Sequence, residues 1–224
     1  MSVGDSEFKT KAQVAYEYLR RLIIGGELPP GSRVLIGEVA NALGFSQTPV
    51  REAVRELVSK GALVLKPHVG VMVPEYSDHT VRELFEIRAV LEGLATRLNA
   101  PYLSEEGFAY LEDVIEKSRA CASKGDFLQY AELDKQFHFY IYKAGPYEFL
   151  FGMISELWDR NVRFSSVFRI CKARMLESAN EHSEIVHAMK AGKAALCEEL
   201  MRKHKQASGR IYMEHMKIGS KAEA

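Results

Sequence analysis

Cysteine is scarce in this sequence of 224 residues, which has only Cys121, Cys171 and Cys197. They are scattered and form no CxxC pair, so the sequence offers neither a metal finger nor a disulfide framework. Reduced thiols of a cytosolic protein are the expected state. Long uninterrupted runs of apolar residues are also missing, which argues against a membrane-spanning helix. We therefore expect a cytoplasmic protein with no membrane association.

Net charge is missing as well, because 30 lysines and arginines balance 30 acidic residues. Residues 1–75 carry nine basic and eight acidic residues, a surplus of one. Any nucleic-acid surface must therefore come from local placement of charge. The first eleven residues are polar and include Asp5 and Glu7, so we expect no secretory signal. What is abundant is hydrophobic residues, at 47%, which is enough for one large domain or two modest ones.

Residues 36–60 predict two short helices joined by a tight turn. The first covers about 36–43 and ends at Gly44, because glycine adopts the left-handed cap conformation without strain. The second begins just before Pro49, a residue that is tolerated only in a first turn. Its apolar residues recur at helical spacing and predict a buried face formed by Val50, Ala53, Val54, Leu57 and Val58.

The opposite face of this second helix is polar and cationic. Ser46 or Thr48 can cap its free amide groups, and Gln47, Arg51 and Arg55 lie on the face left for solvent or a partner. A helix N-terminus favours phosphate, and Arg or Gln can reach base edges. The pattern therefore indicates a DNA-reading helix, although a protein-interaction module would share it.

A small hairpin follows these two helices. Residues 62–65 and 71–73 predict short strands, and a helical pattern from about residue 8 to 24 precedes the unit. The turn between the strands carries Lys66 and the flexible Gly70, which suits contact with a groove wall or phosphate. Residues 1–75 are thus predicted to form a winged helix-turn-helix domain.

The motifs Leu28-Pro29-Pro30-Gly31 and GFSQTPVREA, which begins at Gly44, resemble the N-terminal domain of GntR-type bacterial transcription regulators. This resemblance covers the first third of the chain. It implies that Ser46, Gln47, Thr48 and Arg51 contact operator DNA, with Gly70 as the wing glycine. Two residues depart from the family pattern: Gln47 replaces a usual Arg, and Gly37 stands where some members have a DNA-contacting Arg. Because Gln pairs with adenine, we expect an altered operator.

From residue 76 onwards no further strand is indicated. Six helical segments are predicted, at about 78–99, 104–123, 126–144, 147–169, 173–191 and 193–215. Their short connections favour an antiparallel all-α bundle over residues 76–215. Residues 216–224 are expected to form a frayed tail. The predicted fold class is therefore mainly α, a winged helix followed by a helical bundle.

Polar residues on the apolar stripes of three of these segments are the most informative feature of the bundle. Asp134 and His138 share one face, four residues apart, while His182 and His204 lie on the inward stripes of two other segments. Buried carboxylate and imidazole groups are costly unless they are paired, and one divalent ion would satisfy all four. This ligand set suits zinc, or else manganese, nickel or iron. The alternative is that each is a locally hydrogen-bonded core residue.

The same residues resemble the FCD effector domain of the FadR subgroup of GntR-type regulators, over most of residues 78–210. The resemblance rests on Asp134 with Phe137-His138, on Glu181-His182 and on His204. It implies a divalent metal held by the Asp and three His, with a small carboxylate effector at the open coordination positions.

Three further residues are candidates for the effector site. Arg88 lies on a stripe that is otherwise apolar, Asn161 lies between inward residues, and Arg163 is a weaker candidate. A buried guanidinium needs an anion. That anion is either an effector carboxylate or Glu92, one turn further along the helix.

These features lead to one functional interpretation. The chain is a DNA-binding transcription regulator, a repressor rather than an activator, that works as a homodimer on a palindromic operator and responds to a small carboxylate at its metal. Two alternatives stay open: a hydrolase-like metalloenzyme, and a DNA-binding protein whose metal is purely structural.

Overall fold

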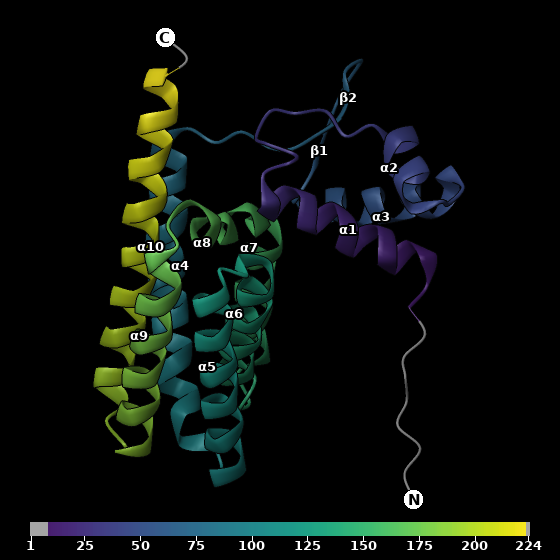
Figure 1. The fold of residues 1–224 in the computed structure, drawn as a ribbon. Helices are drawn as coiled ribbons and strands as arrows, with labels where there is room; N and C mark the ends of the chain where they lie inside the picture. Colours follow the sequence, from purple (N-terminus) through teal and green to yellow (C-terminus); the bar gives the residue numbers. More distant parts are fainter. Residues whose placement is uncertain (1–8, 223–224) are drawn as a thin grey trace, which may run out of the picture. The chain divides into compact units, whose positions relative to one another are not determined.

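The computed structural model describes residues 9–222, with side chains described up to residue 215. Residues 1–8 and 223–224 lie outside the described residues. The expectation that the chain has no secretory signal depends largely on residues 1–8. The chain divides into two compact units (Figure 1). The first runs to Glu75 and includes Asp159–Arg163; the second comprises Tyr76–Trp158 and the chain from Phe164 onwards.

The first unit contains three helices, α1 (Lys11–Gly25), α2 (Ile36–Leu43) and α3 (Gln47–Ser59). Thr10 caps α1, and its hydroxyl accepts from the Gln13 amide while the Gln13 side chain accepts from the Thr10 amide. Gly44 ends α2 with a φ of 65°, as the sequence predicts. Their buried face is made of Leu19, Ile23, Val39, Ala40, Val50, Ala53, Val54 and Leu57.

A two-stranded antiparallel hairpin completes the first unit. Strand β1 (Val64–Lys66) pairs with β2 (Gly70–Met72), with Leu65 opposite Val71. The strands lie nearer the turn than residues 62–65 and 71–73 suggested, because Ala62 and Leu63 are buried in the core and precede the ladder. Helix, helix-turn-helix and hairpin together form the predicted winged helix.

The second unit is all helical. Its elements are α4 (Asp78–Asn99), the 3-10 turn η1 (Ala100–Tyr102), α5 (Glu105–Lys124), α6 (Phe127–Tyr142), α7 (Glu148–Arg160), α8 (Val167–Ile170), α9 (Ala173–Lys190) and α10 (Ala194–Ala222). The last two residues of α7 group with the first unit. Side chains of Ser77, Ser104 and Asp126 accept from backbone amides in the first turns of α4, α5 and α6. These caps set where each helix begins.

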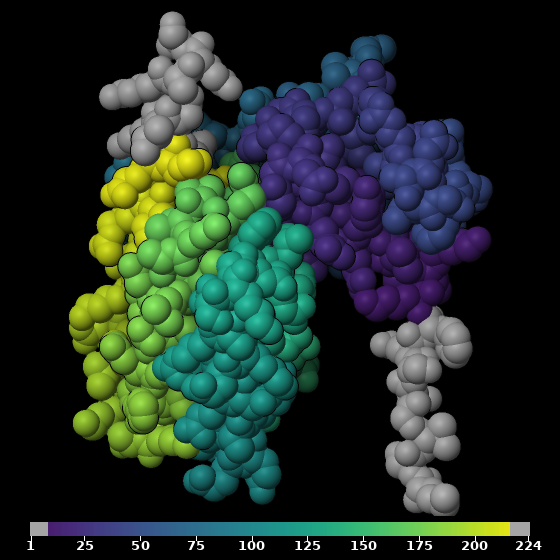
Figure 2. Space-filling view, in the orientation of Figure 1, coloured from purple at the N-terminus to yellow at the C-terminus, as the bar shows by residue number. Residues whose placement is uncertain are grey.

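Long neighbouring helices enclose the core of the second unit. Helix α4 lies along α10, and α5 lies between α6 and α9 (Figure 1). Side chains of α5, α9 and α10 cover the face shown in Figure 2. Glycine permits the close α4–α10 approach: a Cβ on Gly209 would lie 2.8 Å from Cγ of Phe85, and one on Gly93 would lie 2.6 Å from Cγ of Arg202.

Two predictions about helix ends are wrong. The segment 147–169 is not one helix, because α7 ends at Arg160 and a 3-10 turn, η2 (Val162–Ser166), separates it from α8. Val162, Ser165 and Ser166 have modest helix propensities, and serine hydroxyls compete for backbone hydrogen bonds. At the other end, α10 continues through Ala222 rather than ending near residue 215. Among the described helices, none combines the length and apolar character needed to cross a membrane.

Candidate metal centre and nucleic-acid interface

Four buried side chains converge inside the second unit. Asp134 and His138 come from α6, His182 from α9 and His204 from α10, and one ligand atom from each lies within 4.8 Å of the others. Oδ1 of Asp134 is 3.6 Å from Nε2 of both His138 and His182. The structure therefore brings together the whole set that the three inward stripes predicted.

The outer nitrogen of His138 is fixed by a buried hydrogen-bond chain. The Tyr142 hydroxyl donates to Oε2 of Glu92 at 2.7 Å and lies 3.2 Å from Nδ1 of His138. Because the tyrosine proton goes to the carboxylate, the hydroxyl oxygen accepts from Nδ1–H. The lone pair of His138 is then on Nε2, which points into the cluster.

His204 is oriented in the same way by a different acid. Its Nδ1 lies 2.6 Å from Oε2 of Glu181, and Glu181 is held by the guanidinium of Arg174, whose Nη1 donates to Oε1 at 2.8 Å. Nη2 of Arg174 also lies 3.1 Å from Nδ1, but the shorter contact with the carboxylate favours Nδ1–H as its donor, which leaves the lone pair on Nε2. Two separate hydrogen bonds, one to the Tyr142 hydroxyl and one to the Glu181 carboxylate, thus direct two imidazole nitrogens toward one point.

Several polar atoms of this cluster face one another without sharing a proton. The Nε2 atoms of His138 and His204 are only 3.2 Å apart, although both carry lone pairs. Oδ1 of Asp134 and both ring nitrogens of His182 have no hydrogen-bond partner among the described residues. Buried polar atoms without partners are costly, so the ligand set fits a divalent ion. The metal-ligand role of these four residues stays a prediction.

Burial also sets the protonation state of the three imidazoles. Burial, together with nearby cationic groups, holds the pKa of His138 and of His204 well below the usual histidine range. Burial does the same to the pKa of His182, whose ring stacks on Phe137 with centroids 3.9 Å apart. All three are therefore neutral near pH 7, which is the form that binds a metal.

Lys205, which the sequence analysis missed, lies in the same cluster. It is 3% exposed, and its Nζ is 2.8 Å from Nε2 of His138 and 3.1 Å from Oε2 of Glu92. Burial would raise the pKa of Glu92, but Arg88 and Lys205 lower it to about 2. A signal was present, because Lys205 follows Met201 by four residues on the buried stripe of α10. Arg174, also missed, precedes Ser178 and His182 at the same four-residue spacing on α9.

The three predicted effector residues have different surroundings. Arg88 is buried, and its Nε donates to Oε1 of Glu92 at 2.8 Å, so the alternative of a pair within the helix describes its main contact. Asn161 and Arg163 are buried but group with the first unit, where Nη1 of Arg163 donates to the Pro74 carbonyl at 2.9 Å. Because the helix ends at Arg160, the side chains of Asn161 and Arg163 point in other directions than they would in a continuous helix.

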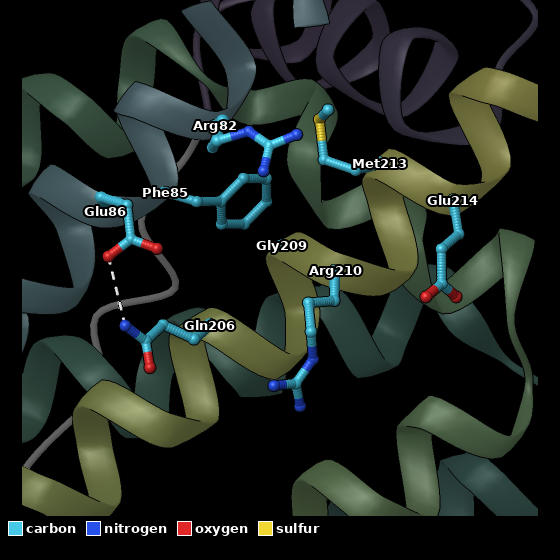
Figure 3. A pocket seen from close by; sticks show the side chains of 8 residues that line it. All are labelled: Arg82, Phe85, Glu86, Gln206, Gly209, Arg210, Met213 and Glu214. Atoms are coloured by element: carbon cyan, nitrogen blue, oxygen red, sulfur yellow. Dashed lines mark hydrogen bonds between the residues drawn. The ribbon is translucent and has the colours of Figure 1, made fainter. Parts of the chain in front are cut away.

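A small cavity adjoins the cluster. It has a volume of about 30 Å³, and its polar lining includes Arg88, Asp134, His204 and Lys205. Neither Asn161 nor Arg163 contributes to that lining. Phe85 forms part of its apolar wall and also lines a larger surface groove between α4 and α10, of about 320 Å³ (Figure 3). Phe85 thus lines both the groove and the cavity.

In the first unit, the predicted DNA-contacting side chains of α3 are exposed. Ser46 occupies the N-cap position without a side-chain cap hydrogen bond. Gln47, Thr48, Arg51 and Arg55 are all exposed, and Nη2 of Arg51 donates to Oε1 of Gln47 at 2.9 Å. The Gln47 amide nitrogen therefore keeps its protons for another acceptor, and α3 presents free backbone amides at its N-terminus.

The hairpin presents a second set of candidate contacts. Lys66 is exposed, and Gly70, with a φ of 112°, adopts a backbone conformation that other residues rarely reach. A Cβ on Gly70 would lie 3.2 Å from Nε of Arg33. Arg33 is exposed and forms a β-bridge with Met72, so it adds a cation beside the wing. Arg33 could not be predicted from the sequence, because an isolated basic residue in a loop carries no periodic signal.

A winged helix-turn-helix joined to a helical bundle with a buried polar cluster is the architecture of a DNA-binding transcription regulator. Residues 83–207 match the family model of the FCD domain, and residues 11–73 match that of the bacterial regulatory proteins of the gntR family. The FCD match covers more than half of the chain. The chain therefore belongs to the GntR family of bacterial regulators and carries an FCD domain.

Known relatives agree with this assignment. The chain is 36% identical over 148 residues to the HTH-type transcriptional regulator McbR of Escherichia coli K12, covering 66% of each chain. It is 30% identical over 200 residues to a probable D-xylose utilization operon transcriptional repressor of Paenarthrobacter nicotinovorans, covering 87% of this chain and 85% of that one.

Solved structures extend the likeness to the fold. E. coli McbR/YncC superimposes with a TM-score of 0.79 at 28% identity, over 93% of this chain and all of the other. A GntR regulator from Rhodococcus sp. RHA1 has a TM-score of 0.72 at 19% identity, over 91% of this chain and 98% of the other. The Rhodococcus match shows the shared fold alone.

Proposed function

We propose that this regulator is a homodimeric repressor, acting in the cytoplasm, whose operator affinity is set by a small carboxylate bound at a divalent metal. One observation carries the proposal. Four buried ligand atoms lie within 4.8 Å of one another. Oδ1 of Asp134 and the ring nitrogens of His182 have no hydrogen-bond partner among the described residues, which costs free energy in a buried site. A cation at their centre removes that cost.

The ligand set favours zinc, with manganese, nickel or iron as alternatives. Asp134, His138, His182 and His204 would supply one oxygen and three nitrogens, and neutral imidazole suits these ions better than calcium. When bound, the ion supplies Lewis-acidic positions that a carboxylate can take. The chain's own residues orient the ligands: Tyr142 fixes the ring of His138, and Glu181 fixes that of His204.

The α3 surface supports operator recognition by this chain. Arg51 and Gln47 form a prearranged pair in which the glutamine amide can donate to an adenine and the guanidinium can reach a neighbouring base or phosphate. Ser46, Thr48 and the α3 amides suit phosphate, and Arg55 continues the same exposed face. Lys66 and Gly70 place the wing for a groove contact.

Repression and dimerisation are the remaining parts of the proposal. One winged helix reads few base pairs, so two copies on a palindromic site, about one DNA turn apart, give adequate specificity. The Paenarthrobacter nicotinovorans relative is described as a probable repressor, which favours repression over activation by this chain. The effector acts because it binds the DNA-bound and DNA-free forms of the protein with different affinities. If the acid changes operator affinity by some factor, operator DNA changes the affinity for the acid by the same factor.

Fluorescence anisotropy with DNA from upstream of the chain's own gene tests this function. We expect zinc-loaded protein to bind tightly with a steep salt dependence, and a short carboxylic acid to shift affinity about tenfold or more, within the usual range of allosteric coupling. Chelator-treated protein should bind DNA without responding to acid. Stoichiometric zinc with no acid response would make the metal structural, and steady consumption of an ester or amide by zinc-loaded protein would favour the hydrolase alternative.

A further inference from the structure

The buried amino group of Lys205 lies where it would compete with a metal ion for His138. Its Nζ lies 2.8 Å from Nε2 of His138, and the chain from Glu92 through Tyr142 leaves the His138 lone pair on that same nitrogen. One lone pair cannot accept an ammonium proton and bind a metal together. An ion held by His138 therefore removes this contact and repels the ammonium.

Few positions are open to the displaced ammonium. Lys205 is on α10, and its Nζ already lies 3.1 Å from Oε2 of Glu92 and 4.8 Å from the ring centroid of Trp158. Lys205 also lines the cavity beside the cluster, together with Arg88 and Ser208. The side chain can stay with Glu92 and direct its remaining protons into that cavity, where an anion would accept them.

The charges of the buried side chains indicate how much negative charge an effector must supply when a divalent ion is bound. The cations are Arg88, Arg174 and Lys205. The acids are Glu92, Asp134 and the partly exposed Glu181. Three positive and three negative charges cancel, so a divalent ion adds two uncompensated positive charges to a site shielded from water. A monocarboxylate cancels one of them, and a dianion cancels both.

From this geometry we propose that Lys205 is a specificity-determining residue that binds a second acidic group, so that the effector is a short dicarboxylic acid. The inference rests on the proposed function, because one carboxylate takes the metal position and the other the Lys205 ammonium. The cavity of about 30 Å³ has to widen even for a small acid, which favours a short chain. Its apolar wall of Phe85, Trp158 and Phe164 offers nothing to further charged groups.

The test measures binding of matched acids to the zinc-loaded full-length protein by isothermal titration calorimetry. The pairs are malonate with propionate and succinate with butyrate, and each pair differs by one carboxylate. We expect each dicarboxylate to bind about tenfold more tightly or better than its partner, which corresponds to about 1.4 kcal/mol or more. In Lys205→Met, each dicarboxylate should bind no more tightly than its monocarboxylate partner.

Two further variants make the result specific. Lys205→Arg keeps the charge and should retain at least part of the preference. Lys203→Met removes an exposed lysine two residues away on the same helix, one paired with Glu199, and should change nothing. Far-ultraviolet circular dichroism and zinc content identify any variant that fails to fold, and in that case Lys205→Gln replaces Lys205→Met.

Every outcome bears on the proposal. Equal affinity of the paired acids for the wild-type protein overturns it, as does a preference that survives Lys205→Met. Tighter binding of inorganic phosphate than of either dicarboxylate reassigns the dianion and overturns the dicarboxylic class. If zinc binds but none of these acids does, both this inference and effector sensing fail. If monocarboxylates bind as well as dicarboxylates, the proposed function stands and only the role of Lys205 is lost.

Discussion

Helices α3 and α6 both carry candidate functional residues, but they present them in opposite directions. In α3 the apolar face is buried and the polar residues Gln47, Thr48 and Arg51 are exposed. In α6 the polar residues Asp134 and His138 are buried within the apolar face itself. Helix α3 therefore adds its candidate function to an ordinary amphipathic helix, while α6 replaces part of its own core with polar groups.

This difference has an energetic consequence. Exposed polar residues cost little free energy of unfolding when they are changed, so α3 can vary its candidate contacts without loss of fold. Buried polar residues need partners that fully satisfy them, and here those partners come from α4, α9 and α10. Changes in the buried site should therefore alter stability and ligand binding together, whereas changes on α3 should alter DNA binding alone.

The largest effect is expected from removing metal ligands. His138→Ala combined with His182→Ala takes two of four ligands and should lower zinc affinity by about a thousandfold or more, since each ligand contributes on the order of several kcal/mol. Zinc content after dialysis, measured by mass spectrometry, should fall from one ion per chain to none.

The matched control for the ligand variants is His187→Ala. His187 is exposed and lies on α9 with His182, so it should keep full zinc content. Full zinc retention by the double variant would show that the ion, if any, is held elsewhere, and it would remove α6 from the sensor.

The next effect concerns pH and the metal-free protein. The pKa values of His138, His182 and His204 are lowered in the folded chain, so the unfolded chain binds protons first as pH falls. The stability linked to these groups is complete above about pH 6.5 and decreases below it. Three such groups give a loss of roughly 2–4 kcal/mol between pH 6.5 and pH 5.5.

Urea unfolding across this pH range checks the sign and the size of the effect. Saturating zinc should raise stability at pH 6.5 and lose much of that advantage at pH 5.5, where protons compete for the imidazoles. Flat metal-free stability between the two pH values would mean that the three histidines accept protons inside the fold, contrary to their burial.

A smaller effect is expected on α3. Arg51→Ala should weaken operator binding by about a hundredfold, near 2–3 kcal/mol, because it removes a cation from the base-contacting face and frees Gln47 from its partner. Thermal stability should be unchanged. Anisotropy with operator and scrambled DNA separates loss of specificity from loss of general affinity.

Arg169→Ala is the charge-matched control, because Arg169 is an exposed arginine of the helical unit. It should bind operator like the wild type. Equal operator affinity of the Arg51 variant would take Arg51 out of the contact set and shift attention to Arg55 and to the wing residues Lys66 and Arg33.

The same contrast explains what could be predicted from the sequence. Helix α2 was predicted with its observed bounds, because an apolar face and a C-capping glycine are local signals. The convergence of Asp134, His138, His182 and His204 was predictable because each breaks an apolar stripe at a helical period. Periodicity in a sequence thus identifies polar residues that interrupt an otherwise apolar helical stripe.

What could not be predicted depends on contacts between distant helices. The helix break after Arg160 has no glycine or proline to mark it, so the directions of Asn161 and Arg163 were beyond reach. Lys205 follows a histidine already assigned to the site. Helical spacing places Lys205 on a buried stripe, but the partners of its ammonium are visible only once α4 supplies Glu92 and α6 supplies His138.

The smallest effect is expected from removing the buried cation Lys205. Because the Lys205 ammonium and a metal compete for the lone pair of His138, Lys205→Met should tighten zinc binding by about tenfold, or 1.4 kcal/mol, in competition titrations with a chromophoric chelator. Lys203→Met, on the exposed side of α10, should leave zinc affinity unchanged. Weaker zinc binding in the Lys205 variant would mean that the ammonium supports the ligand set instead of opposing the ion. An exposed cation such as Arg51 affects only the group that it contacts, because water screens its charge. A buried cation such as Lys205 changes the net charge of the whole site, which the ion and its ligands have to compensate.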